Sequence, residues 1–245
     1  MQIYVRPAPF QVLSFDLDDT LYDNRPAIAI AERELLQHVH QQHPQTVSWQ
    51  RQDWRAQKLK VLQRNPKLAH DPSAARLEVL TQGFKHLGLG NKAFSAAKDA
   101  FDCFYFHRSN FTVETSVLTL LAELGQRYRL IGVTNGNVEA ERIGLTPALE
   151  LVLRAGNGLR MKPYADMFVE ASQHLQINLN QVMHIGDSLG SDVAGARLAG
   201  CQATWLSPGY GRDQPEADWM ANNKHPMLPQ VSIQHITELR HFLSC

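Results

Sequence analysis

Short apolar runs in this sequence end at residues whose side chains can do chemistry. The first run, Val12 to Phe15, is followed at once by Asp16 and Asp18. Ligands of an open parallel sheet bind outside the carboxyl ends of its strands, so polar residues that follow apolar runs can meet at one edge. The residues that the same reasoning groups with the two aspartates are Thr134, Asn135, Lys162, Asp187 and Asp192.

The types of these side chains indicate phosphoryl transfer. Several carboxylate oxygens around one point suit a hard divalent cation, and Mg²⁺ takes one or two carboxylates together with water and phosphate oxygens. A lysine and a threonine hydroxyl opposite that cation are what an anionic phosphoryl group needs. One carboxylate can attack phosphorus to form an aspartyl phosphate. A second acid two residues further on can protonate the leaving oxygen and later activate water.

The elements that must position these residues follow an alternating pattern. After the strand at 12–15, the sequence predicts strands at 130–136, 151–156, 182–187 and 202–207. Helical periodicity lies between them at 163–175 and at 191–199, where Gly200 follows as a typical helix end. This alternation predicts a parallel sheet with helices on both of its faces. A short strand and a last helix at about 235–243 complete the expected core.

A long insertion separates the first two of these strands. Thr20 and Thr134 lie 114 positions apart, whereas a simple crossover unit needs about 30 residues. Apolar residues recur at helical spacing through most of the excess. The sequence therefore predicts a core domain made of residues 1–23 and 111–245, with a helical domain of residues 24–110 inserted into it.

Composition restricts the classes of protein that remain. The 245 residues include 24 Lys and Arg and 24 Asp and Glu, so the summed charge gives no reason to expect a nucleic acid or a membrane surface as a partner. Three cysteines without metal-binding spacing favour a reducing compartment. With no stretch like a signal sequence or a membrane span, the expected location is the cytoplasm. A monomer and a dimer both remain open.

Four motifs in order carry a resemblance to a known family. "DLDDT" at residue 16, "VTNG" at 133, "KP" at 162 and "GDSLGSD" at 186 resemble the four motifs of the haloacid dehalogenase superfamily of phosphatases. The resemblance implies a Rossmann-like core, Mg²⁺ and hydrolysis of a small phosphate monoester, and it makes the helical insertion similar to the C1 cap of that superfamily.

The resemblance also implies a role for each matching residue. Asp16 is expected to be the nucleophile, and Asp18 the general acid and base. Thr134, Asn135 and Lys162 would hold the phosphoryl group. The implied magnesium ligands are Asp16, Asp187 and the main-chain carbonyl of Asp18, with Asp192 supporting them. Dehalogenases of the superfamily lack the second aspartate, so Asp18 favours the phosphatases.

A narrower resemblance points towards a substrate. "FDLDDTLYDNRP" together with a helical cap is similar to bacterial phosphatases that act on flavin mononucleotide and on 5-amino-6-(5-phospho-D-ribitylamino)uracil, an intermediate of riboflavin synthesis. Other sugar, nucleotide or vitamin phosphates, including pyridoxal phosphate, remain alternatives. A phospho-receiver-like binding protein and a non-catalytic member of the same fold are further alternatives of a different class.

Several residues near these motifs have simpler explanations. Asp19 has no chemical role that the pattern supports. His184, within an expected strand, is interpreted as a packing residue. Tyr22 is expected either to order the entry to the insertion or to touch the substrate.

Overall fold

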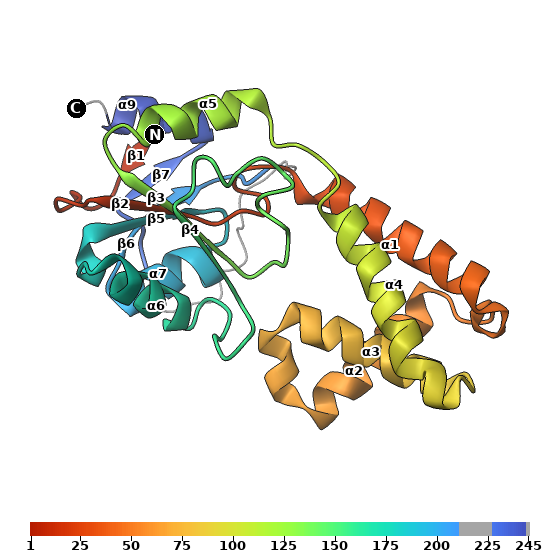
Figure 1. Ribbon diagram of the computed structural model, residues 1–245. Helices are drawn as coiled ribbons and strands as arrows, with labels where there is room; N and C mark the ends of the chain where they lie inside the picture. Colours follow the sequence, from red (N-terminus) through yellow and green to blue (C-terminus); the bar gives the residue numbers. More distant parts are fainter. Residues whose placement is uncertain (211–226, 244–245) are drawn as a thin grey trace. The chain divides into compact units, whose positions relative to one another are not determined.

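The computed structural model describes residues 1–210 and 227–243. The chain forms two compact units, one made of residues 1–24 and 112–245 and the other of residues 25–111. Figure 1 shows a sheet with flanking helices in the first unit and a group of helices in the second. The interpretation of the inserted helices as a cap stays a prediction.

A seven-stranded sheet organises the first unit. Its strand order is β1-β7-β6-β5-β2-β3-β4, and every neighbouring pair is parallel except β1 with β7. This confirms the predicted fold class, a mostly parallel sheet flanked by helices. The strands are β1 (Gln2–Ile3), β2 (Val12–Phe15), β3 (Arg129–Thr134), β4 (Leu151–Arg154), β5 (Val182–Gly186), β6 (Gln202–Leu206) and β7 (Val231–Ile233).

The central strands are buried on both faces. Every residue of β2, β5 and β6 is buried, as expected for parallel strands covered by helices on each side. The strand β2 lies between β3 and β5, where the chain changes direction across the sheet. Ligands of open α/β sheets bind at such a switch point, so the carboxyl end of β2 is the position to inspect.

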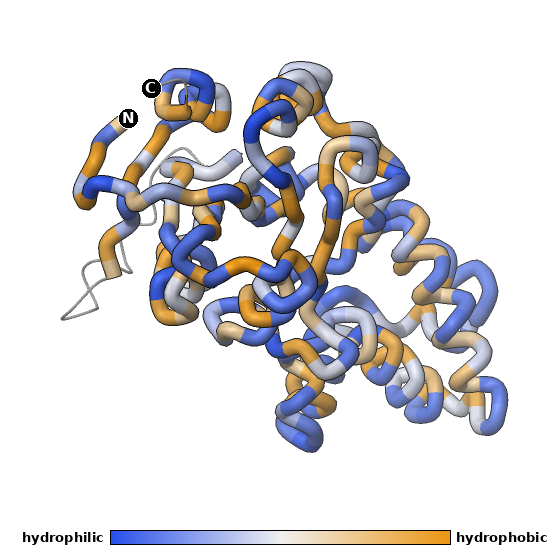
Figure 2. The backbone as a smooth tube through the Cα atoms, turned by 60° about the vertical axis from the view of Figure 1, so that its left-hand side comes forward, coloured by the Kyte–Doolittle hydropathy of each residue, from blue (hydrophilic) through white to orange (hydrophobic). Residues whose placement is uncertain are grey.

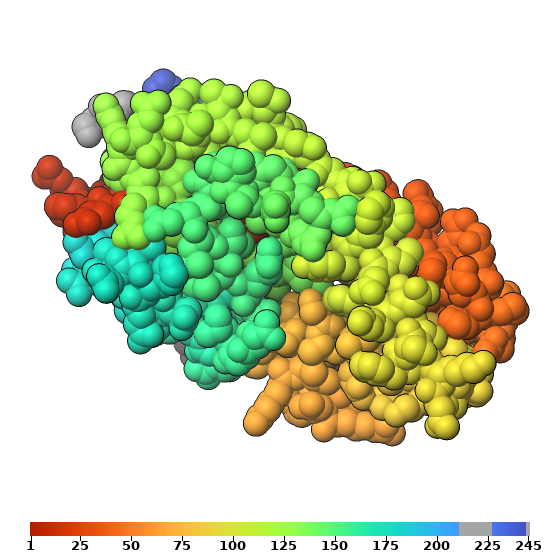
Figure 3. Space-filling model, viewed as in Figure 1, coloured from red at the N-terminus to blue at the C-terminus, as the bar shows by residue number. Residues whose placement is uncertain are grey.

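Helices cover the two faces of this sheet. Figure 1 places α5 (Thr115–Leu124) and α9 (Leu239–Leu243) on one face, and α6 (Asp166–Leu175) and α7 (Ala194–Ala199) on the other. In the space-filling view of Figure 3, the green segments that follow β3 and β4 cover much of the first unit's visible face.

The second unit is built from four helices with a common apolar core. Figure 2 shows hydrophobic and hydrophilic residues alternating along them, which is the pattern of helices buried on one side. Phe84 and Phe104 are fully buried at the centre. The four helices are α1 (Asn24–Gln42), α2 (Arg51–Arg64), α3 (Pro72–His86) and α4 (Ala93–Arg108).

Two helices of the first unit begin differently from their predictions. The helix expected at 163–175 begins at Asp166, and the one expected at 191–199 begins with a π-helical turn at Leu189–Val193. The second difference has a local cause, because the Asp192 side chain turns inwards and accepts a hydrogen bond from the Ser188 amide at 2.9 Å. A Cβ at Gly186 would overlap that side chain, so glycine is required there.

Candidate active site

The first predicted site residue, Asp16, follows β2 directly. Its backbone N–H continues the pairing of the sheet by donating to the carbonyl oxygen of Ile185 at 2.8 Å. Its side chain is buried and accepts a hydrogen bond from Lys162 Nζ at 2.7 Å through Oδ1. The Thr20 hydroxyl lies 3.5 Å from the other oxygen, Oδ2. The carboxylate is therefore fixed at the carboxyl end of the central strand.

Lys162 stands at the centre of the charged groups. Its side chain is completely buried, and Nζ lies 2.7 Å from an oxygen of Asp16 and 2.7 Å from an oxygen of Asp192. The same ammonium donates to the Val133 carbonyl oxygen. Three acceptors thus surround a group that has three protons to donate, which keeps a buried ammonium charged.

The pKa values of these groups reflect burial and neighbouring charge. Burial raises the pKa of Asp16 well above its usual value, and the carboxylates of Asp192 and Asp187 add to that rise, while Lys162 opposes it. Burial acts against the charge of Lys162, but Asp16 and Asp192 raise its pKa. Although burial also acts against the Asp192 carboxylate, Lys162 and His184 lower its pKa. Lys162 thus opposes the effect of burial on both carboxyl groups that it contacts.

A divalent cation fits the carboxylates of this site. One oxygen each from Asp16, Asp187 and Asp192 lie within 4.8 Å of one another, and all three residues are buried. One lysine faces these three acids, so negative charge is in excess, and like charges so close repel one another. The donor set consists of carboxylate oxygens, which Mg²⁺ prefers.

The predicted phosphate-binding residues lie next to Lys162. The Asn135 side chain makes two hydrogen bonds to the Lys162 backbone, accepting from its N–H at 2.7 Å and donating to its carbonyl oxygen at 3.0 Å. Asn135 therefore holds the Lys162 segment against the end of β3 through its side chain. The Thr134 hydroxyl is buried and accepts a hydrogen bond from the Gly136 amide at 3.0 Å.

Asp18 lies outside the group of three acids. Its Oδ1 accepts a hydrogen bond from the Tyr22 hydroxyl at 2.5 Å. A Cβ at Gly136 would overlap Asp18 Oδ2, so the chain after β3 approaches this carboxyl group closely. The structure therefore brings Asp16, Lys162, Asp187 and Asp192 together as one cluster, with Asp18 beside the turn that follows Thr134.

Asp19 has a structural role that the sequence pattern did not indicate. Its φ of 60° lies in the left-handed region, and its Oδ1 accepts a hydrogen bond from the Asn24 amide at 2.9 Å. Its carbonyl oxygen accepts from the Tyr210 amide at 2.8 Å. Aspartate is one of the few residues that enter this region routinely, so Asp19 shapes the loop that leads to α1.

His184 belongs to the support of the site. It is fully buried on β5, and its ring packs edge-on against Phe168 at a centroid distance of 5.0 Å. Its Nδ1 lies 2.9 Å from the Ser14 hydroxyl and its Nε2 lies 3.3 Å from Asp192 Oδ1. Burial, reinforced by the charge of Lys162, lowers the pKa of His184 to about 4. The ring is therefore neutral near pH 7 and contacts Asp192 from the side of the core.

Comparison with known proteins gives a consistent family assignment. A model of haloacid dehalogenase-like hydrolases matches residues 10–200. The chain is 35% identical over 240 residues to 5-amino-6-(5-phospho-D-ribitylamino)uracil phosphatase YigB of Escherichia coli K12, covering 98% of both chains. It is also 30% identical over 127 residues, 49% of this chain, to a phosphoserine phosphatase of Thermus thermophilus.

Solved structures share the fold over nearly the whole chain. A 2-haloacid dehalogenase from Pseudomonas syringae superposes with a TM-score of 0.86 at 28% identity, covering 96% of this chain and 98% of the other. The HAD-hydrolase YfnB of Bacillus subtilis, in a magnesium-bound crystal, matches with a TM-score of 0.62 at 22% identity, covering 97% and 100% of the two chains.

Proposed function

The chain belongs to the haloacid dehalogenase-like hydrolases, and from this premise we propose that it hydrolyses a small phosphate monoester through an aspartyl phosphate on Asp16. The family assignment confirms the resemblance inferred from the four motifs. The protein is a phosphatase of that family, given a named phosphatase at 35% identity over 98% of both chains. The observation that supports the proposed mechanism best is the buried contact of Asp16 with Lys162.

In the proposed first step, an oxygen of Asp16 attacks phosphorus and the bond from phosphorus to the leaving oxygen breaks. Asp18 donates a proton to that oxygen, so the product leaves as an alcohol. Lys162, with Thr134 and Asn135 beside it, balances the charge of the phosphoryl oxygens. In the second step Asp18 takes a proton from water, the water oxygen attacks phosphorus, and the bond from phosphorus to the Asp16 oxygen breaks. This releases inorganic phosphate and restores the Asp16 carboxylate.

A bound magnesium ion would supply further positive charge to the phosphoryl oxygens. The residues proposed to hold it are Asp16, Asp187 and the main-chain carbonyl of Asp18. Asp192 is proposed to support them through Lys162, since the Asp192 carboxylate contacts the lysine that also binds Asp16.

We propose flavin mononucleotide or 5-amino-6-(5-phospho-D-ribitylamino)uracil as the substrate. The second of these is supported by the name of the Escherichia coli relative and by its similarity along the full chain. Flavin mononucleotide is supported by the resemblance of the "FDLDDTLYDNRP" stretch. The partner is then a small phosphorylated metabolite. The helices in the described part of the chain lack the combination of length and apolar character that crossing a membrane requires.

Dehalogenation is a second activity to measure, because the chain is 28% identical to a 2-haloacid dehalogenase structure. Asp18 counts against it, because the dehalogenase reaction releases halide and needs no acid to protonate an alcohol. The two candidates are separated by one comparison of purified protein, with chloride release from 2-chloropropionate measured beside phosphate release from phosphate esters.

The main test is a substrate panel with Mg²⁺ present. We expect phosphate release from 4-nitrophenyl phosphate, a higher kcat/KM for the two proposed substrates than for pyridoxal phosphate and common sugar phosphates, and loss of turnover in EDTA. Asp16→Asn is expected to lower turnover by about a thousandfold or more, since it removes the nucleophile. Asp102→Asn, an exposed aspartate on α4, is the matched control.

Distinct outcomes contradict distinct parts of the proposal. Unchanged turnover in Asp16→Asn, or full activity in EDTA, refutes the mechanism. A higher kcat/KM for sugar phosphates than for the two riboflavin-related substrates refutes the substrate and leaves the phosphatase assignment intact.

A further inference from the structure

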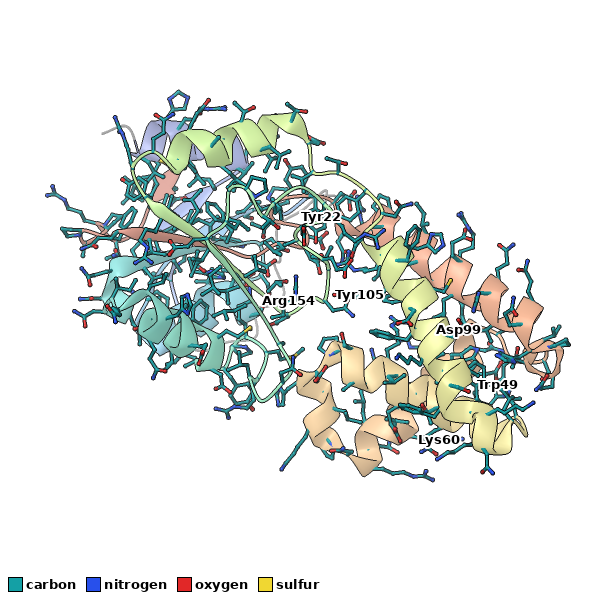
Figure 4. The ribbon with its side chains drawn as sticks, in the orientation of Figure 1. Tyr22, Trp49, Lys60, Asp99, Tyr105 and Arg154 are labelled. Atoms are coloured by element: carbon teal, nitrogen blue, oxygen red, sulfur yellow. The ribbon has the colours of Figure 1, made fainter. Side chains whose placement is uncertain are left out.

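Tyr22 is a buried residue that the proposed mechanism does not use. It lies in the loop between β2 and α1, where Figure 4 labels it, and the residue is 5% exposed. Its hydroxyl donates a hydrogen bond to Asp18 Oδ1 at 2.5 Å. The Asp19 amide donates to the Tyr22 carbonyl oxygen at 2.9 Å. The backbone thus holds the phenol next to the carboxyl group of Asp18.

The other oxygen of Asp18 is confined from the opposite direction. A Cβ added to Gly136 would overlap Asp18 Oδ2, so the backbone of residue 136 lies against this oxygen. A hydrogen bond holds the turn at Gly136 in place, because the Gly136 amide donates to the Thr134 hydroxyl at 3.0 Å. The carboxyl group of Asp18 therefore has one oxygen bound to a phenol and the other beside the turn that carries Thr134.

This arrangement distinguishes the two oxygens chemically. A carboxylic acid carries its proton on one oxygen and accepts hydrogen bonds on the other. Since Oδ1 accepts a hydrogen bond from the Tyr22 hydroxyl, the proton that Asp18 can transfer is carried by Oδ2. That oxygen lies on the side of the turn next to Thr134, which the proposed function assigns to the phosphoryl group.

We propose that Tyr22 is a positioning residue that directs Asp18 Oδ2 towards the leaving group. The inference rests on the proposed function, in which Asp18 protonates the leaving oxygen. During that step the O–H bond on Oδ2 breaks and an O–H bond forms on the leaving alcohol. Tyr22 keeps its own proton and maintains the hydrogen bond to Oδ1 throughout.

The experiment compares substrates that differ in how much they need protonation. 4-Nitrophenolate leaves readily without a proton, whereas the alkoxide of an alkyl phosphate does not. Tyr22→Phe is expected to lower kcat/KM for an alkyl phosphate about tenfold, the effect of losing one hydrogen bond. For 4-nitrophenyl phosphate the change is expected to stay within about twofold.

Two further variants connect this effect to Asp18. In an Asp18→Asn background, Tyr22→Phe is expected to cause no additional loss of kcat/KM. A residue that acts through Asp18 has no effect once the acid is absent. Tyr128→Phe is the matched control, since this tyrosine stacks on Phe10 next to the opposite end of β3. We expect it to leave kcat/KM unchanged for both substrates.

Equal losses for the two substrates, or no loss in either, would overturn the role of Tyr22. Thermal unfolding shows whether Tyr22→Phe is folded. If it is not, Tyr22→His, which keeps a ring at this position, is measured in its place. A selective loss for the alkyl phosphate then supports the inference, and equal losses for the two substrates overturn it. Absence of phosphate release by the wild-type protein refutes the proposed function itself, which is a separate result.

Discussion

At the scale of single residues, the site depends on buried side chains that have more than one partner. Lys162 binds Asp16 and Asp192 at the same distance of 2.7 Å, and Asn135 holds the backbone of Lys162 through both atoms of its amide. These contacts join the ends of β2 and β3 to the segment before α6. The residues that the proposed chemistry requires are therefore positioned by one another as much as by the sheet.

Asp19 allows a prediction at this scale. We expect Asp19→Ala to lower the free energy of unfolding by about 1–2 kcal/mol, because alanine is strained in the left-handed region and cannot accept the hydrogen bond from Asn24. Asp19→Gly removes the strain and is expected to recover part of that loss. Urea unfolding measures both variants. Equal stability of the wild-type and alanine proteins would show that this loop does not contribute to stability.

At the scale of elements, periodicity and burial explain what could be predicted. The strands expected at 12–15, 182–187 and 202–207 agree with the structure to within one residue, because a short, mostly apolar segment between turn residues is typical of a buried strand. The two-residue strand β1 was missed. Its residues are exposed and pair with β7 across more than 200 positions of sequence, so neither burial nor local pattern reveals it.

The candidate site was predictable in residue type but not in its contacts. The order of the polar positions after each strand follows from the sequence, since the carboxyl ends of parallel strands meet at one edge. The contact of Tyr22 with Asp18 and the inward turn of Asp192 depend on loop conformations. Side-chain hydrogen bonds within a loop leave no periodic signal in a sequence, so only the structure reveals these two contacts.

The beginning of α6 gives a prediction about pH. Asp166 binds the Arg160 guanidinium through both oxygens, at 2.8 and 3.0 Å. Hydrogen bonds from Arg160 lower the pKa of Asp166 from 3.8 to about 2. Folding therefore favours the ionised form of Asp166. Its contribution to the free energy of unfolding is complete above the pKa of the unfolded state and is lost as the pH falls from about 4 to 2.

Asp166→Asn is expected to cost about 1 kcal/mol of unfolding free energy at pH 7, a modest value because the Arg160 side chain is 52% exposed. Near pH 2 most of the difference between variant and wild type should be lost. Urea unfolding at several pH values measures it, with Glu170→Gln on the same helix as the matched control. A difference that persists at pH 2 would contradict the ion pair as its source.

At the scale of the whole molecule, the chain is divided between two units with separate cores. Residues of the helical unit pack around Phe84 and Phe104, whereas the sheet unit packs α6 and α7 against β5 and β6. Each of these two clusters consists of residues of one unit. A change inside one core is therefore expected to act first on the unit that contains it.

Gly83→Ala tests this division. Gly83 is buried on α3, and a Cβ there would overlap the Trp54 ring and lie 3.1 Å from Trp49. Overpacking of this kind costs about 1–3 kcal/mol. We expect faster amide hydrogen exchange in α3 and α4, measured by mass spectrometry, with the strands of the sheet unit unchanged as the internal control. Equal loss of protection in the sheet would show that the two units unfold together.

The contact between Trp205 and Asp187 has a spectroscopic consequence. The Trp205 indole N–H donates to the Asp187 carbonyl oxygen at 2.9 Å, and the residue is 8% exposed. The emission of an indole depends on the polarity around it and on the hydrogen bond that it makes. Trp49 and Trp54 lie in the helical unit, so each unit contains a fluorophore. The protein thus carries its own optical probe of the loop that holds a proposed metal ligand.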